Sequence, residues 1–203
     1  MLSAAWSYID NTVPFILIAA PFILCWRIVS AFMTSKSRGC TFFKSINVLR
    51  EILIILFSVF VIGLVSQTVI PHMEWSDGGF TVSIPENYVA KYNFIPFAAI
   101  SDALHKIFVD INLYYVIYLV GNIIVFVPVG FFIALLPQKE IKAWHAAGIS
   151  FLVSVFIEMV QMFLPRMVDV DDIILNTLGG FSGYLLYLLL KKAAPAFVKR
   201  VKM

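Results

Sequence analysis

The sequence predicts an all-α protein, a polytopic bundle of about five transmembrane helices with a long outer loop that carries an amphipathic helix. The first observation is composition: of 203 residues, 61% are hydrophobic and only 13% are charged. A soluble domain has about 25% charged residues, so a soluble enzyme and a disordered protein are both excluded. The second observation is a set of five apolar stretches near the ~20 residues that a spanning helix needs: 13–33, 48–70, 113–136, 143–164 and 173–190.

The first apolar stretch, residues 13–33, is interrupted by Arg27. An arginine near the end of a span can extend its guanidinium to the membrane surface, so a spanning helix is predicted here. An interfacial helix, which would leave four spans, is the alternative. The first 12 residues contain no Lys or Arg, whereas a cleaved signal peptide begins with a basic region. We therefore expect this segment to stay in the mature protein.

Charged residues between the spans predict the orientation of the bundle. If five helices alternate, 12 of the 15 Lys and Arg residues fall on one side and most of the acidic residues on the other. The positive-inside rule places the basic side in the cytoplasm, which gives an outer N-terminus and a cytoplasmic C-terminus. A net charge of only +3 gives little attraction to phosphate backbones, so no nucleic-acid partner is expected.

The second loop, residues 71–112, is too long for a plain connection between packed helices. Asp77-Gly78-Gly79 is a turn signal, and residues 80–84 alternate in the manner of a short strand. Farther along, an amphipathic helix is predicted to lie on the outer surface of the bilayer. It either covers the mouth of the bundle or takes part in binding. Its apolar face consists of Ile100, Leu104, Ile107 and Phe108.

Polar side chains in the last three spans are the strongest functional signal. Glu158 lies within the fourth span, where an ionised carboxylate is costly unless it is paired or hydrated. Ser154, Glu158 and Gln161 are spaced i, i+4, i+7, so they share one helix face, which must point into the bundle. Alternating topology predicts that other polar groups lie at a similar outer depth: Asn122, Arg166, Asp169, Asp171, Asp172 and Asn176.

Several of these polar residues also have a structural interpretation. Asp171 or Asp172 could cap the fifth helix by accepting hydrogen bonds from its free amides. The two asparagines could form interhelical hydrogen bonds. Gly179 and Gly183 are spaced for close helix packing, which we favour over a chemical role. For Glu158, in contrast, the cost of intramembrane charge favours a functional interpretation.

These residues and their order along the chain resemble the sequence motifs of the VanZ-like family. The resemblance covers about residues 67–190, preceded by an amino-terminal two-span region (1–66) and followed by a basic cytoplasmic tail (191–203). Five blocks occur in the family's order: Asn93-Phe94-Ile95-Pro96-Phe97, Asn122-x-x-x-Phe126-x-Pro128-x-Gly130-Phe131, Ser154-x-x-x-Glu158-x-x-Gln161, Arg166-x-x-Asp169-x-Asp171-Asp172 and Asn176-Thr177-x-Gly179-Gly180-x-x-Gly183-Tyr184.

The family takes its name from a protein associated with resistance to teicoplanin, a lipid-bearing glycopeptide directed at the bacterial wall. The resemblance implies a multi-pass plasma-membrane protein, surrounded by membrane lipids, that lowers susceptibility to such antibiotics. An outer-leaflet polar pocket would bind an amphiphile, either the acyl tail of a glycopeptide antibiotic or a lipid-linked cell-wall component. Arg166 would pair with an anionic head group. The binding candidates are Asn122, Glu158, Gln161, Arg166 and Asn176.

The alternative is an intramembrane enzyme that modifies a lipid-linked or cell-wall substrate by carboxylate acid–base chemistry. Its catalytic candidates are Glu158, Arg166, Asp169 and Asp172, and Asp171 could join the other two aspartates in holding a hard divalent ion. A transporter is disfavoured, because the polar residues stop in the outer half and no second half repeats the first. The residues leave the ligand, any cofactor and the oligomeric state open.

Overall fold

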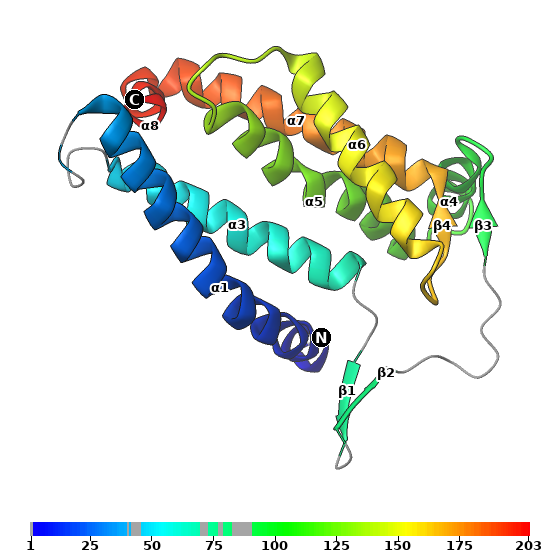
Figure 1. The fold of residues 1–203 in the computed structure, drawn as a ribbon. Coiled ribbons are helices and arrows are strands. Elements are labelled where there is room, and N and C mark those ends of the chain that lie inside the picture. The colour runs from blue at the N-terminus through cyan, green and yellow to red at the C-terminus, as the bar shows by residue number, and fades with distance from the viewer. Residues whose placement is uncertain (1, 40, 42–45, 70–72, 77–78, 83–90) are drawn as a thin grey trace.

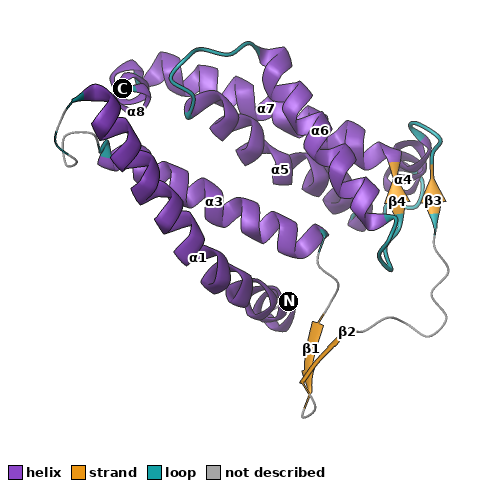
Figure 2. Ribbon diagram, in the orientation of Figure 1, coloured by secondary structure: helices purple, strands orange, loops and turns teal. Residues whose placement is uncertain are grey.

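A computed structural model describes residues 2–39, 41, 46–69, 73–76, 79–82 and 91–203, and most of them are helical (Figure 1, Figure 2). The predicted fold class is confirmed, since five helices in this described part are long and apolar enough to cross a membrane. They are α1 (Leu2–Arg38), α3 (Val48–Thr68), α5 (Tyr114–Leu135), α6 (Ala143–Gln161) and α7 (Val170–Ala193).

Helices α5 and α7 form the centre of the bundle, and α6 packs against α7 (Figure 1). The contact between α5 and α7 is close because Gly179 and Gly183 lie directly on the backbone of α5. A Cβ atom at these positions would collide with the carbonyl oxygens of Ile123 and Val127, respectively. The packing interpretation of the two glycines is therefore confirmed.

Helix α1 packs against α3 at the edge of the bundle (Figure 1). Within α1, residues Thr12–Ser37 form an apolar segment long enough to span a membrane, which favours the spanning prediction over the interfacial alternative. Arg27 does not need to extend to the surface, because its Nε donates to Glu51 Oε2 at 2.7 Å and its Nη2 lies 2.5 Å from Glu51 Oε1. This bidentate pair was not predicted, and pairing lowers the cost of both charges in a span.

The basic tail forms a packed helix, α8 (Pro195–Lys202), which follows α7 closely. Val198 and Val201 are buried against Leu135 and Tyr187. Lys202 Nζ donates to the carbonyl oxygens of Ala134, at 3.0 Å, and Pro137, at 3.1 Å. Residues 195–202 are therefore part of the bundle, at the end where α5 finishes.

Part of the long loop forms two-stranded pairings. Strands β1 (Met73–Ser76) and β2 (Gly79–Val82) are antiparallel, with Met73 opposite Val82. The predicted strand is confirmed over residues 80–82. Residues 83 and 84 and the predicted turn residues Asp77 and Gly78 lie outside the described residues. Strands β3 (Tyr92–Asn93) and β4 (Val168–Asp169) pair in parallel, which joins the long loop to the start of α7.

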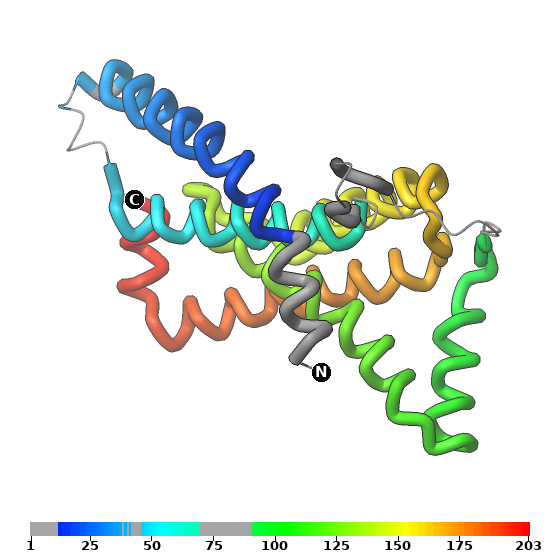
Figure 3. Tube along the Cα trace, turned by 90° about the horizontal axis from the view of Figure 1, so that it is seen from below, coloured from blue at the N-terminus to red at the C-terminus, as the bar shows by residue number. Residues whose placement is uncertain are grey.

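The predicted amphipathic helix is α4 (Ala98–Phe108). Its apolar face is divided: Ile100 and Ile107 are half-buried, whereas Leu104 and Phe108 are exposed, the latter by 78%. The buried centre of the face is Ala103, because a small side chain lets α4 approach the bundle. Helix α4 lies at one end of the bundle and α8 at the other, which is visible in two perpendicular views (Figure 1, Figure 3).

Candidate functional site

A network of carboxylates occupies the end of the bundle where α4, β3 and β4 meet. Glu158 of α6 is 5% exposed, and its Oε2 accepts a hydrogen bond from the Asp169 backbone N–H at 3.0 Å. Asp169 Oδ1 in turn accepts from the Asp171 N–H at 2.9 Å and from Asn93 Nδ2 at 3.0 Å. The two acids therefore connect α6, strands β3 and β4, and the start of α7.

Asp169 is the residue that caps α7. The interpretation that Asp171 or Asp172 caps this helix is wrong, because the chain is still extended at Asp169, with φ −136° and ψ 119°. An extended residue directly before a helix places its side-chain oxygen beside the free amides of the first turn. Burial is the main effect that raises the pKa of Asp169, and the charge of Asp171 adds to it, while hydrogen bonds from the Asp171 amide and Asn93 oppose the rise.

Asp171 caps α4, a different helix from its own. Its Oδ1 accepts from the Phe97 N–H at 2.5 Å and its Oδ2 from the Ile100 N–H at 2.9 Å. The side chain is completely buried. Phe97 has a left-handed backbone, with φ 66°, and no local side chain caps α4. The carboxylate of Asp171 therefore replaces a local cap and fixes α4 to the bundle.

Asp172 extends the network to α5. Its Oδ1 accepts from Asn122 Nδ2 at 2.7 Å and from the Tyr118 hydroxyl at 3.0 Å. The sequence indicated Asn122 but not Tyr118. The signal for Tyr118 was its spacing, because a residue four positions before Asn122 lies on the same helix face. Asn93 was likewise absent from the predicted binding residues, although it is the partner of Asp169.

Three carboxylate oxygens of the network form no hydrogen bond with the residues that the structure describes: Glu158 Oε1, Asp169 Oδ2 and Asp172 Oδ2. None of them is sealed from solvent, because Ser150 Oγ is the one fully buried, unpartnered side-chain polar atom in that part of the chain. They belong to α6, β4 and α7, and each can still accept a hydrogen bond from a ligand or from water.

The remaining predicted site residues lie around this network. Ser154, Glu158 and Gln161 are all buried, so the prediction that their face points inward is confirmed. Gln161 Nε2 donates to the Thr68 carbonyl at 3.0 Å, which ties α6 to the end of α3. Asn176 Nδ2 donates to Ser154 Oγ at 2.8 Å, an interhelical bond of the kind expected for structural asparagines.

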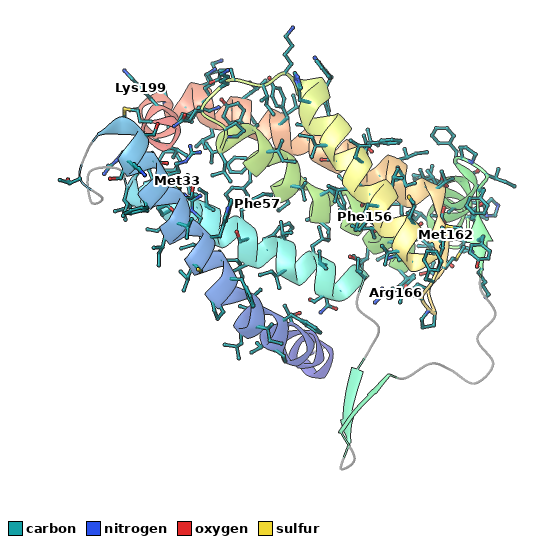
Figure 4. All side chains as sticks on the ribbon, in the orientation of Figure 1. Met33, Phe57, Phe156, Met162, Arg166 and Lys199 are labelled. Atoms are coloured by element: carbon teal, nitrogen blue, oxygen red, sulfur yellow. The ribbon has the colours of Figure 1, made fainter. Side chains whose placement is uncertain are left out.

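Arg166 lies in the turn between α6 and β4 and is half-buried (Figure 4). The network described above is built without its guanidinium: amide, hydroxyl and backbone N–H groups are the donors to the four carboxylates. Arg166 therefore belongs to the rim of the site, on the chain segment that carries Asp169.

The three aspartates do not form a set of metal ligands. Within the described ranges, no group of three or more His, Cys, Asp or Glu side chains is placed to hold a metal ion. The reason is clearest at Asp171, since both of its oxygens accept backbone hydrogen bonds from α4. What the arrangement offers chemically is a set of fixed hydrogen-bond acceptors.

A family model described as VanZ/LLP1 matches residues 52–191, which is more than half of the chain. The chain belongs to the VanZ/LLP1 family. The match confirms the resemblance found in the sequence and includes every residue of the carboxylate network. It begins inside α3, ahead of about residue 67, the start of the resemblance found in the sequence. Neither a curated protein nor a solved structure matches this VanZ/LLP1 protein.

Proposed function

We propose that this VanZ/LLP1 protein resides in the bacterial plasma membrane and lowers susceptibility to teicoplanin-type glycopeptide antibiotics by binding an amphiphile at the carboxylate network. Family membership and five apolar helices support the membrane setting and the link to glycopeptides. The observation that carries the binding proposal is the set of three open carboxylate oxygens on Glu158, Asp169 and Asp172. The other oxygen of each of these carboxylates already accepts a hydrogen bond, as do both oxygens of Asp171.

The open oxygens define the chemistry of the polar part of the ligand. Carboxylate oxygens only accept hydrogen bonds, so the ligand must present hydroxyl, amide or ammonium groups to them. Charge-assisted bonds of this kind are about twice as strong as neutral ones. Arg166, on the adjacent turn, would add a contact to an anionic group of the same ligand.

The surface beside the network defines the apolar part of the ligand. Phe94, Ile95 and Phe97 precede α4 and are each at least 60% exposed, and Phe108 at its other end is 78% exposed. The backbone N–H of Phe97 donates to Asp171, so this apolar surface begins next to the network. An acyl chain would fit beside these side chains, while a sugar or peptide head would face the carboxylates.

The test of the binding proposal is antibiotic susceptibility of cells that produce matched variants. Glu158→Gln and Asp172→Asn each replace an open carboxylate by a neutral amide of the same shape. We expect both to lose protection against teicoplanin, with a smaller effect on vancomycin, which has no acyl tail. Asp102→Asn is the control, because Asp102 is exposed on α4 and pairs with Lys106 outside the network.

Membrane levels of each variant are measured alongside, so that loss of protein is distinguished from loss of binding. Unchanged teicoplanin susceptibility in both network variants would remove the carboxylates from the explanation. Absence of any protection by the unaltered protein would overturn the resistance proposal itself.

A second candidate is an intramembrane enzyme that modifies a lipid-linked or cell-wall substrate. The observation in its favour is that Glu158 and Asp169, which are hydrogen-bonded neighbours, both keep an open oxygen and could exchange a proton with a substrate. This candidate requires a covalent change in the envelope. Identical mass spectra of lipids and wall fragments from cells with and without the protein would exclude it.

A further inference from the structure

A cavity of about 320 Å³ lies between the end of α7, α8 and the connection between α5 and α6. This is the end of the bundle away from the carboxylate network, and Figure 4 marks it by Lys199. Lys191, Lys199 and Lys202 line the cavity together with Glu140, and Pro195 and Val198 contribute an apolar wall. The volume lies at the lower limit of small-ligand sites.

One of the three lysines has a structural role. Lys202 is 10% exposed at its side chain, donates to two carbonyl oxygens at the end of α5 and lies 3.6 Å from Glu140 Oε1. Its ammonium also sits over the ring of Tyr187, 5.0 Å from the centroid. Burial lowers the pKa of Lys202, although Glu140 opposes this effect. These contacts hold its ammonium group in the cavity lining.

The other two lysines retain donors for a ligand. Lys191 is 44% exposed at its side chain and contacts Glu140 Oε1 at 3.2 Å. Lys199 is exposed, and its side chain has no ion pair or hydrogen bond with the residues that the structure describes. Glu140 is the single acidic side chain in the lining, which Met203 completes, so three lysine side chains face one side-chain carboxylate.

Glu140 keeps its negative charge in this setting. Burial alone would raise its pKa, but the Tyr187 hydroxyl, which donates to Oε2 at 2.7 Å, and the two neighbouring lysines lower it overall. An ionised Glu140 holds Lys191 and Lys202 in place at the cavity wall. One carboxylate is shared by Lys191 and Lys202, so it does not neutralise both of them, and Lys199 adds a further positive charge to the lining.

We propose that this cavity binds the phosphate group of an anionic phospholipid. Lysine ammonium groups are established donors to phosphate oxygens. Basic pockets between transmembrane helices are suited to lipid head groups, because the acyl chains continue along the lipid-facing helices. Pro195 and Val198 would contact the glycerol and the first methylene groups. The phosphate could also come from a soluble phosphate ester, and the experiment separates the two sources.

The experiment uses the full chain, purified in uncharged detergent, with its thermal unfolding midpoint titrated against phosphatidylglycerol, phosphatidylcholine and glycerol phosphate. We expect phosphatidylglycerol alone to raise the midpoint. The double variant Lys191→Gln/Lys199→Gln should weaken the apparent phosphatidylglycerol affinity roughly 30-fold. Lys192→Gln/Arg200→Gln is the matched control, since it removes the same charge from the exposed surface of the same two helices without altering the cavity lining.

The control double variant should retain the affinity of the unaltered protein within about twofold. Equal losses in both double variants would overturn the proposal, because they would indicate unspecific attraction to basic helices. Stabilisation by glycerol phosphate as strong as that by phosphatidylglycerol would overturn the lipid source in favour of a soluble ester. Circular dichroism in detergent establishes that both variants keep their helices.

Discussion

At the residue scale, the three aspartates that follow Arg166 have three different roles. Asp169 caps α7, Asp171 caps α4 and Asp172 accepts hydrogen bonds from two side chains of α5. That all three can accept hydrogen bonds at a similar depth in the bundle could be predicted from the sequence, but the partner of each aspartate could not. The direction of each side chain depends on a short extended segment, Val168–Asp169, which pairs with residues far away in the chain.

The buried carboxyl of Asp169 should make stability depend on pH. Burial raises its pKa in the folded protein, so between the ordinary value and the raised value the folded state binds more protons than the unfolded state. Its contribution to stability is therefore lost as pH rises through that window. We expect the unfolding midpoint of the unaltered protein to fall relative to that of Asp169→Asn as the pH rises above about 4, the ordinary value for an aspartate.

Asp169→Asn is suitable for this comparison because an amide oxygen can still accept from Asn93 and from the Asp171 N–H. The measurement is thermal unfolding in neutral detergent across the pH range. The other carboxylates are common to both proteins, so the difference between the two curves reports Asp169 together with its charge interactions with neighbours such as Asp171. Parallel curves would show that this carboxyl does not change its protonation on folding.

At the element scale, the apolar length of each span was enough to predict it. Hydropathy predicted all five spanning helices. The charge of Arg27 marked an interruption in the first apolar stretch. The pairing of Arg27 with Glu51 required the structure, because a sequence does not state which helix lies beside α1. The same reason applies to α8, whose basic residues predicted a tail while Val198 and Val201 bury it against the bundle.

The contact between α5 and α7 should be intolerant of added side-chain volume. In Gly183→Ala, the new Cβ would overlap the Val127 carbonyl oxygen on α5, so the helices must separate. We expect a loss of about 2 kcal/mol in the free energy of unfolding, typical of overpacking. Chemical unfolding in mixed micelles, followed by tryptophan fluorescence, measures this loss.

Gly121→Ala is the matched control for Gly183→Ala. Gly121 also lies in a spanning helix, and a Cβ there would contact nothing within 4 Å. Alanine has the higher helix propensity, so this change should leave stability unchanged or increase it by up to about 1 kcal/mol. Similar losses for both variants would contradict the close-packing explanation and would indicate a general effect of replacing glycine.

At the scale of the whole molecule, the two ends of the bundle differ in charge, and each carries one of the two proposed sites. Helices α4 and α8 occupy opposite ends of the bundle (Figure 1, Figure 3). The carboxylate network lies beside α4 and the lysine cavity beside α8. The arrangement agrees with the charge pattern from which the orientation was predicted. That orientation, with the basic end in the cytoplasm, stays a prediction and is open to a direct test.

Single cysteines at the two ends would determine the orientation. In a background without Cys25 and Cys40, Ser101→Cys on α4 and Ala196→Cys on α8 each place a thiol at an exposed position. The positive-inside rule predicts that a membrane-impermeant maleimide labels Ser101→Cys in intact cells and Ala196→Cys only after permeabilisation. The reverse labelling pattern would invert the proposed topology and place the carboxylate network in the cytoplasm.

The sequence by itself determined that this is a membrane protein, how many spans it has, which family it belongs to and which polar residues lie together in the bundle. These follow from composition, from periodicity along one helix and from the spacing of motifs, which are properties of a linear chain. Only the tertiary structure decided which donor each carboxylate accepts from, that Asp171 caps α4 and which oxygens stay open. Several of those assignments join segments far apart in the chain, such as Phe97 and Asp171, which are 74 residues apart, or Tyr118 and Asp172, which are 54 apart. They also depend on backbone directions that local sequence does not specify.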